Sequence, residues 1–353
     1  RIKMQDKLNL LMEKEMIIGG TSISPGERKR VLLDVAKLYD FTDMNIPIEV
    51  IRGKKDGPVL FVSGAIHGDE INGVEIIRQL LTHKALSRIK GTLIAVPIVN
   101  VFGFNTKSRY LPDRRDLNRC FPGSENGSLA AQIAHIFMTE IVQKCTHGID
   151  LHCAAINRIN LPQIRACLDD PLTENMAKAF HVPVVLHSEL RDGSLRQATK
   201  ELGIPTLLFE GGESLRFNGK VIKGGLQGVL SVMRDIGMLP AVKSKKAEHN
   251  VFIARSSHWV RAPHSGILSI KKKIGERVEK GQILGIISDP FGKQKIEILA
   301  RKTGIVIGSV TLPLLNKGDA VFHIATFRNS NAVEENVDLF EEHLDLAAED
   351  RFS

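Results

Sequence analysis

The sequence predicts an α/β protein, in which helices cover both faces of a sheet, followed by a smaller all-β unit. Between residues 59 and 236, short apolar runs of strand length alternate with longer runs whose apolar residues recur at helical spacing. After a Lys-rich stretch at 240–250, the pattern changes to brief β runs with turn residues every ~8–12 positions. We therefore expect a large domain at 1–240, a β domain at 251–326 and an acidic helix at 331–353.

The strands of the large domain are predicted from apolar runs bounded by turn residues. They lie, in order, at 30–37, 46–52, 59–63, 92–96, 148–151, 182–186 and 206–209. The run at 59–63 follows the turn Lys55–Pro58 and is apolar throughout except for its last residue, which is typical of a strand buried on both faces.

The helices of the large domain are predicted where apolar residues recur every three or four positions. The first is amphipathic, with Met4, Leu8, Leu11 and Met12 on one face, and the others lie at 70–81, 129–144, 195–202 and 226–236. Residues 100–122, dense in Arg, Asp, Asn and Gly, predict a long loop, which in a compact domain is usually either functional or disordered.

The β domain and the tail have patterns of their own. Its strands are predicted at 267–270, 277–278, 283–287, 296–299, 305–307 and 321–324. In the acidic tail, Val333, Val337, Phe340 and Leu344 repeat at helical spacing. We expect an amphipathic terminal helix that packs on this chain or on a neighbour.

Composition narrows the class of protein. A chain of 353 residues with 43% hydrophobic residues can bury a large core without disulfides. Its four cysteines have no CxxC spacing and no secretory segment precedes them, which favours a reducing cytoplasm, and no apolar run is long enough to cross a membrane. The net charge of +8 is spread over short basic runs, and one Trp and two Tyr offer few surfaces for base stacking. We therefore expect no binding to nucleic acid, and a basic surface that attracts small anions.

Three side chains predict a metal site. His67 and Glu70 stand three residues apart after the strand at 59–63, and His152 follows the strand at 148–151. Two imidazoles and one carboxylate are the ligands of a catalytic zinc, because they leave a coordination position open for water. A histidine after a strand is more often a structural residue, but the ends of neighbouring strands are where sites collect in α/β sheets.

Glu210 is a fourth candidate side chain, and we predict that it transfers protons at the metal site. It ends the strand at 206–209 and precedes Gly211 and Gly212, which allow a sharp turn beside the carboxylate. Hydrolysis at a metal needs a carboxylate that takes a proton from water and gives it to the leaving nitrogen. The alternative role is a salt bridge at the end of a strand.

Four motifs, in this order, resemble one family. They are Gly64–Val74 (GAIHGDEINGV), Asp116–Arg119 (DLNR), Asp150–His152 (DLH) and Glu210–Gly212 (EGG), and the resemblance covers roughly residues 20–325. The family is that of succinylglutamate desuccinylase and aspartoacylase, a branch of the zinc carboxypeptidase-like hydrolases. The resemblance implies a carboxypeptidase-like mixed sheet in 1–240, one zinc held by His67, Glu70 and His152, and Glu210 as general base and acid.

The resemblance also implies roles for polar residues near the metal. Asn118 and Arg119 would bind the α-carboxylate of the substrate, since a guanidinium beside an amide donor can form hydrogen bonds to both oxygens of a carboxylate. Arg109 would stabilise the oxyanion, although Arg114 or Arg115 could take that place. Arg196 is a candidate for the end of the acyl chain, with a solvated helix residue as the alternative.

The β domain resembles the barrel-sandwich hybrid of biotinyl and lipoyl domains. The matching segments are 262–267, 275–282 and 302–305. Lys293 lies at a plausible hairpin but lacks the flanking residues of a modified lysine, so we expect no modification. The domain would instead cover the mouth of the active site or form an interface in a homo-oligomer.

Together these observations predict a cytoplasmic zinc amidohydrolase that removes the N-acyl group from a small N-acylated amino acid. A zinc carboxypeptidase acting on peptides is the nearest alternative, and an esterase would use the same groups. A non-catalytic scaffold that binds carboxylates is the alternative from another class.

Overall fold

The computed structural model describes residues 15–241 and 250–349. The predicted N-terminal helix, with Met4, Leu8, Leu11 and Met12, lies outside the described residues, as does most of the stretch at 240–250.

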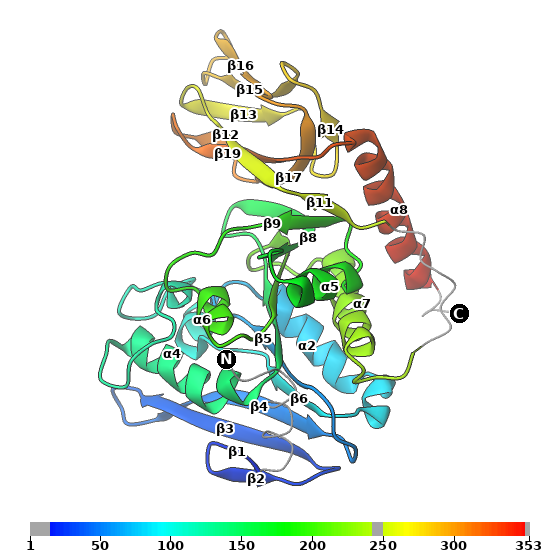
Figure 1. Cartoon of the computed structure of the whole chain (residues 1–353). Helices are drawn as coiled ribbons and strands as arrows, with labels where there is room; N and C mark the ends of the chain where they lie inside the picture. Colours follow the sequence, from blue (N-terminus) through cyan, green and yellow to red (C-terminus); the bar gives the residue numbers. More distant parts are fainter. Residues whose placement is uncertain (1–14, 242–249, 350–353) are drawn as a thin grey trace.

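Parallel strands form the centre of the large sheet (Figure 1). They are β6 (Thr92–Val96), β5 (Val59–Gly64), β7 (His147–His152) and β10 (Thr206–Glu213), in this spatial order. Because these strands run in one direction, their carboxyl ends lie at one edge of the sheet, and His152 and Glu210 are register partners at that edge.

Antiparallel strands extend the centre on both sides, so the sheet is mixed as predicted. On one side are β4 (Asp43–Arg52) and β3 (Arg28–Lys37), and on the other are β8 (Arg158–Ala166) and then β9 (Val184–His187), which is parallel to β8.

Helices cover both faces of this sheet, and each face has its own apolar core. In β5, Leu60 and Val62 pack into one core, whereas Val59 and Phe61 pack into the other. The first core contains α2 (Asn72–Thr82), α5 (Pro171–Ala179) and α7 (Gly219–Asp235), and the second contains α3 (Val101–Thr106), α4 (Leu129–Glu140) and α6 (Leu195–Glu201).

Helix boundaries differ from the predictions for physical reasons. α2 begins at Asn72, so Glu70 lies in the turn before the helix. α7 begins at Gly219, well before the predicted 226, because its glycines hid the apolar pattern. These glycines allow close packing, since a Cβ on Gly228 would lie 2.0 Å from the ring of Phe180. The prediction for α4 was too long at its end, where Val142–Lys144 form a separate 3-10 turn.

β8 and α5 were not predicted from the sequence. β8 carries Asn160, Gln163 and Arg165 among its apolar residues, and these polar side chains interrupt the strand pattern. The predicted loop at 100–122 contains α3 and the 3-10 turn Leu117–Arg119. Other short strands that were not predicted are β1 (Met16–Ile18), β2 (Thr21–Ile23), β11 (Phe252–Ala254) and β18 (Leu314–Leu315).

The C-terminal β region has a core of its own between two sheets. One sheet contains β16 (Lys295–Leu299), β15 (Ile283–Ser288), β13 (Gly266–Ile270) and β18. The other contains β12 (Ser256–Arg261), β19 (Ala320–Thr326), β17 (Gly304–Val310) and β14 (Arg277–Val278). This second sheet continues into the large one, because β17 pairs with β8 and places Gly308 beside Asn160.

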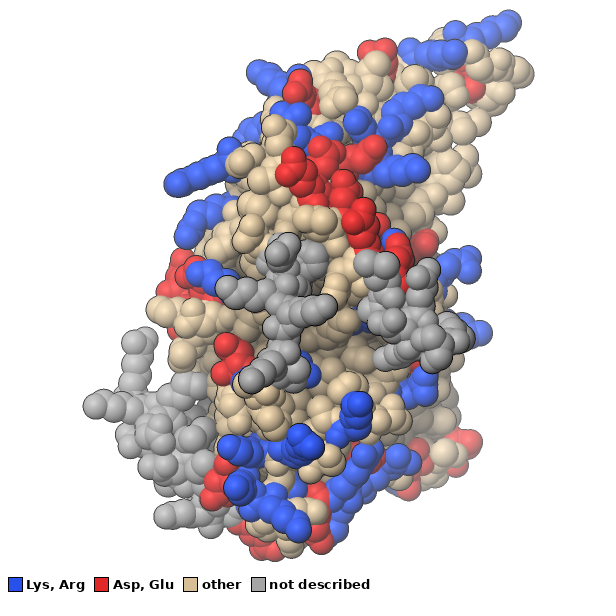
Figure 2. Space-filling view, turned by 90° about the vertical axis from the view of Figure 1, so that its right-hand side faces the viewer, with Lys and Arg blue, Asp and Glu red and all other residues tan. Residues whose placement is uncertain are grey.

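The terminal helix α8 (Ser330–Glu349) packs on its own chain. Val333 and Val337 contact the apolar cluster where β8, β9 and β17 meet, and Phe340 and Leu344 join the core that contains α7. Figure 2 views the side that carries α8 and shows acidic side chains gathered in a band among scattered basic ones. Among the described residues, no helix combines the length and the apolarity that a membrane span requires.

Candidate metal centre and active site

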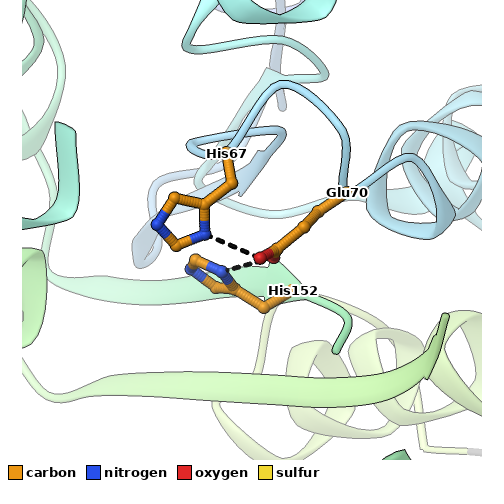
Figure 3. Close-up of side chains that lie close together, drawn as sticks. All are labelled: His67, Glu70 and His152. Atoms are coloured by element: carbon orange, nitrogen blue, oxygen red, sulfur yellow. Dashed lines mark hydrogen bonds and ion pairs between the residues drawn. The ribbon is translucent and has the colours of Figure 1, made fainter. Parts of the chain in front are cut away.

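His67, Glu70 and His152 meet at the carboxyl edge of the central strands (Figure 3). His67 and Glu70 lie in the turn between β5 and α2, and His152 ends the neighbouring parallel strand β7. Glu70 lies between the two imidazoles, with Oε1 2.7 Å from Nδ1 of His67 and Oε2 2.8 Å from Nδ1 of His152. The potential ligand atoms of these three described residues all lie within 4.8 Å of one another, so the three side chains could hold one metal ion.

The charges of this group fit a divalent cation. All three side chains are buried, and burial opposes ionisation of Glu70, yet the neighbouring His67 and His152 hold its pKa well below the usual value. Burial also opposes the charged form of His152, but Asp150 and Glu70 outweigh it and raise its pKa well above normal. Without a metal, the negative charge of Glu70 is therefore balanced by protonated imidazoles of the neighbouring histidines. A zinc ion would replace those protons, because its ligands are neutral imidazoles and a carboxylate.

Two aspartates hold the histidines by their other nitrogens. Nε2 of His67 lies 2.9 Å from Oδ1 of Asp116, and Nε2 of His152 lies 2.6 Å from Oδ2 of Asp150. Carboxylates in this position fix the tautomer that leaves Nδ1 free for a metal. Both aspartates lie within the motifs that carry the family resemblance, but no role was predicted for them. The signal for Asp150 is its spacing, since a residue two positions before His152 in a strand lies on the same face.

Arg109 contacts the same carboxylates. Its guanidinium donates to Oε1 of Glu70 at 3.1 Å and to Oδ2 of Asp116 at 3.0 Å. Arg114 and Arg115, the alternatives for its role, are exposed and do not line the cavity beside Glu70. The structure therefore brings Arg109, and neither alternative, to the metal centre.

Glu210 lies on β10 beside His152 and lines the same cavity. Its Oε2 accepts a hydrogen bond of 2.9 Å from Nδ2 of Asn160, and its Oε1 lies 3.8 Å from Nε of Arg165. The ion pair with Arg165 is at the long end of the range, so the salt bridge proposed as the alternative role is a weak one. The amide of Asn160 fixes one carboxylate oxygen.

Asn118 and Arg119 lie side by side on the 3-10 turn that follows α3. Asn118 is buried, and its Oδ1 accepts a hydrogen bond of 2.9 Å from the backbone N–H of Leu195. Its NH2 group has no acceptor among the described residues, which leaves two donors for a ligand. Arg119 is exposed, and both residues line the cavity.

Arg196 is buried, with only 8% of its surface exposed, so the alternative of a solvated helix residue is wrong. Its guanidinium donates to Ser188, to the carbonyl oxygen and to Oγ, both at 3.3 Å. Burial lowers its pKa to about 10, and the charge of Arg165 contributes to that shift. Arg196 lines the cavity from α6.

The cavity has a volume of about 240 Å³ and includes a wall from the C-terminal β region. Trp259 of β12 lines it and stacks on His323, with ring centroids 4.5 Å apart. The guanidinium of Arg158 lies 5.0 Å from the centre of the Trp259 ring. None of these residues was predicted from the sequence to belong to the site. The one available signal was that Trp259 is the single tryptophan of the chain.

The catalytic part of the chain matches one family. Residues 56–236, more than half of the chain, match the model of the succinylglutamate desuccinylase/aspartoacylase catalytic domain. The chain belongs to this family.

Other proteins are similar to this chain over most of its length. N-alpha-acetyl-L-2,4-diaminobutyric acid deacetylase of Halomonas elongata is 26% identical over 295 residues, which are 79% of this chain and 85% of that protein. A succinylglutamate desuccinylase/aspartoacylase structure from Rhodobacter sphaeroides matches with a TM-score of 0.77 and 24% identity, over 87% of this chain and 98% of the other. The product-bound ectoine utilization protein EutE (DoeB) from Ruegeria pomeroyi matches with a TM-score of 0.78 and 24% identity, over 89% and 100% of the two chains. The predicted α/β fold with a mixed sheet is thereby confirmed.

Proposed function

We propose that this protein is a zinc-dependent amidohydrolase that removes the N-acyl group from a small N-acylated amino acid. The observation that carries the proposal is that His67, Glu70 and His152 share one cavity with Glu210 and a group of arginines. Membership of the family and the deacetylase activity in the name of the Halomonas relative support the same reaction.

The three buried ligands would hold the metal, and Asp116 and Asp150 would orient the two imidazoles. When bound, zinc supplies a Lewis acid for the amide carbonyl and lowers the pKa of a water molecule towards about 7.

Glu210 moves the protons in this proposal. Its carboxylate takes a proton from the attacking water and delivers it to the leaving nitrogen, so that the amine departs uncharged. Asn160 anchors one oxygen of Glu210, which keeps the carboxylate in one orientation during both transfers. Arg109 donates one hydrogen bond to Glu70 and one to Asp116. The remaining N–H groups of its guanidinium can donate to the carbonyl oxygen as negative charge develops on that oxygen.

Asn118 and Arg119 bind the α-carboxylate of the substrate. The free amide donors of Asn118 and the exposed guanidinium of Arg119 can contact both carboxylate oxygens, which fixes the orientation of the amino acid. Arg196 lines the same cavity and would contact the acyl chain.

The C-terminal β region would act as a cover for the cavity. We propose that it has the barrel-sandwich hybrid fold that its motifs predict, which its two sheets around one core support. Trp259 lines the cavity, and a cavity of about 240 Å³ suits a small substrate better than an extended peptide.

A turnover assay tests the proposal. Zinc-loaded protein is incubated with a panel of N-acylated amino acids, and primary amine release is followed in parallel with a sample treated with a chelator. We expect amine release that chelation abolishes and added zinc restores. Release of C-terminal residues from peptides would favour the carboxypeptidase, and zinc-loaded protein without any turnover would favour a binding scaffold.

A further inference from the structure

The proposed chemistry requires Glu210 to keep a fixed position relative to metal ligands that come from two other strands. His152 ends β7, and its register pairing with Glu210 on β10 places these two residues beside each other. His67 and Glu70 lie in the turn after β5, and β7 separates β5 from β10 in the sheet. The position of Glu210 relative to this turn therefore also depends on contacts beyond the pairing of the strands.

Asn72 supplies such a contact. It is the first residue of α2, shortly after Glu70, and it is completely buried. Its Nδ2 donates a hydrogen bond of 3.3 Å to the carbonyl oxygen of Glu213, and its Oδ1 accepts one of 2.9 Å from the backbone N–H of Asn218. Glu213 ends β10, and Asn218 directly precedes α7. One amide therefore closes the loop that follows the strand of Glu210.

The two partners of Asn72 require an amide at this position. The carbonyl oxygen of Glu213 needs a donor, whereas the N–H of Asn218 needs an acceptor. An amide supplies both from one planar group, but a carboxylate supplies only acceptors. Because the side chain is buried, removing it would leave two backbone groups without a partner, which disfavours the closed loop.

Neighbouring atoms add to the connection between the turn and the loop. The N–H of Leu215 donates to the carbonyl oxygen of Asp69 at 2.9 Å. Gly212 leaves room for the amide, since a Cβ there would lie 2.9 Å from Nδ2 of Asn72. The register of β10 with β8 shifts between Glu210 and Gly212, an irregularity that allows the strand to bend there. The end of β10 thus follows the turn that carries two of the metal ligands.

We infer that Asn72 is a positioning residue that holds Glu210 in place relative to the metal ligands, through the loop after β10. The inference rests on the proposed deacylase function and adds a residue to it. Asn72 is outside the cavity lining, so it acts without contacting the substrate. Its loss affects the chemical step, because a displacement of about 1 Å in a reacting group can slow a reaction by about 100-fold.

Asn72→Ala tests the inference by steady-state kinetics with an N-acylated amino acid. We expect kcat to fall by about 10- to 100-fold, while KM and the zinc content stay near the wild-type values. The substrate and the metal keep their own contacts in this variant, so only the proton transfer is slowed. A kcat near the wild-type value, or a loss that lies in KM alone, would overturn the inference.

Asn218→Ala is the matched control for local stability. It removes the side chain that accepts a hydrogen bond from the N–H of Val221 at the start of α7, but it keeps the backbone N–H that donates to Asn72. We expect this variant to unfold at a lower temperature than wild type and to keep the wild-type kcat. Equal losses of kcat in Asn218→Ala and Asn72→Ala would show that the loop supports folding and does not position Glu210.

A double-variant cycle identifies the group through which Asn72 acts. In Glu210→Gln the side chain at 210 no longer transfers protons, so its exact position matters little. Adding Asn72→Ala to this variant should lower kcat by less than about 2-fold further. A residue that acts on the fold in general would lower kcat by the same factor in both backgrounds, and that result would contradict the inference.

Measurements on the purified chain decide the inference without turnover. Crystal structures of wild type and Asn72→Ala give the position of the Glu210 carboxylate, and amide hydrogen exchange follows Leu215 and Asn218. We expect faster exchange of both amides in the variant and a carboxylate displaced by about 1 Å relative to His67. If no N-acyl compound is cleaved, the proposed function fails, and these measurements still apply: a carboxylate that does not move would overturn the inference.

Discussion

Glu70 connects the groups on which the proposed chemistry depends. Its two oxygens reach Nδ1 of both histidines, and Oε1 also accepts from Arg109. A buried carboxylate with this many cationic neighbours remains ionised. The charge needed to hold a divalent cation is therefore present before the metal binds.

Glu210→Gln separates metal binding from proton transfer. Glutamine keeps the size of the side chain, but its amide does not accept a proton from water. We expect zinc content to stay at the wild-type level while kcat falls by roughly 10²–10⁴-fold. Zinc analysis and amine release on the same preparation are the measurements, and turnover near the wild-type rate would remove Glu210 from this role.

Arg119→Ala tests recognition of the α-carboxylate. The variant should raise KM strongly for an N-acyl amino acid and hardly at all for its α-amide or α-ester, since only the acid loses an ion pair. KM and kcat are measured for the acid and both analogues. Equal increases for all three compounds would show that Arg119 acts on the fold and not on the carboxylate.

Among the elements, β8 connects the two parts of the molecule. Its Asn160 holds Glu210, and on its other side β17 brings Gly308 beside the same asparagine. A Cβ on Gly308 would lie 2.6 Å from Oδ1 of Asn160, so a side chain there displaces the amide that anchors Glu210. We therefore expect a side chain at position 308 to shift Glu210 through Asn160.

Gly308→Ala tests this connection. We expect kcat to fall roughly 10- to 100-fold with little change in KM or zinc content, because a small displacement of the proton carrier slows only the chemical step. Gly219→Ala is the control, since an added Cβ at that position has no atom within 4 Å. A wild-type kcat in Gly308→Ala would show that the C-terminal region does not position Glu210.

Whether an element could be predicted from the sequence depends on what its side chains contact in the fold. β5 and β6 bury apolar residues on both faces, so their continuous apolar runs indicated them within one residue. β8 was missed because polar residues that face the cavity interrupt it, and α7 was placed too late because its glycines serve close packing. In both cases the residues suit contacts with other parts of the fold, so they depart from the apolar spacing that is typical of a strand or a helix.

The residues of the site also fall into two groups, those that could be selected from the sequence and those that could not. His67, Glu70 and His152 could be selected because they follow strands that the sequence indicated, and the structure brings them together. Arg158, Arg165 and Trp259 could not be selected, because their approach depends on the pairing of β8 with β10 and of β17 with β8. Such long-range pairing leaves no local signal in the sequence.

At the scale of the whole molecule, buried neutral histidines make stability depend on pH. Burial lowers the pKa of His147 to about 4, and burial with the charges of Arg165, His258 and Arg158 lowers that of His323 to about 3. The unfolded value is about 6.5, so below that pH the unfolded chain binds protons that the folded protein does not. The contribution of these two histidines to the free energy of unfolding should be highest above pH 6.5 and fall as the pH falls towards 4, by at most about 1.4 kcal/mol per pH unit for each histidine.

His323→Phe isolates one of these groups. Phenylalanine keeps a ring for stacking on Trp259 but does not titrate. Urea unfolding at pH 7.5, 6 and 5 should show that the variant loses less stability than wild type on acidification. The metal centre titrates in both proteins, so the difference between them reports His323, and parallel losses would contradict its low pKa.

The central claim is that His67, Glu70 and His152 together hold one zinc ion. Its most direct test is the zinc content per chain, measured by elemental analysis after dialysis, for wild type and for His152→Ala. Three ligands predict one zinc per wild-type chain and almost none in the variant, because two remaining ligands bind far more weakly. Wild-type protein that takes up no zinc, or a variant that keeps a full equivalent, would contradict the claim.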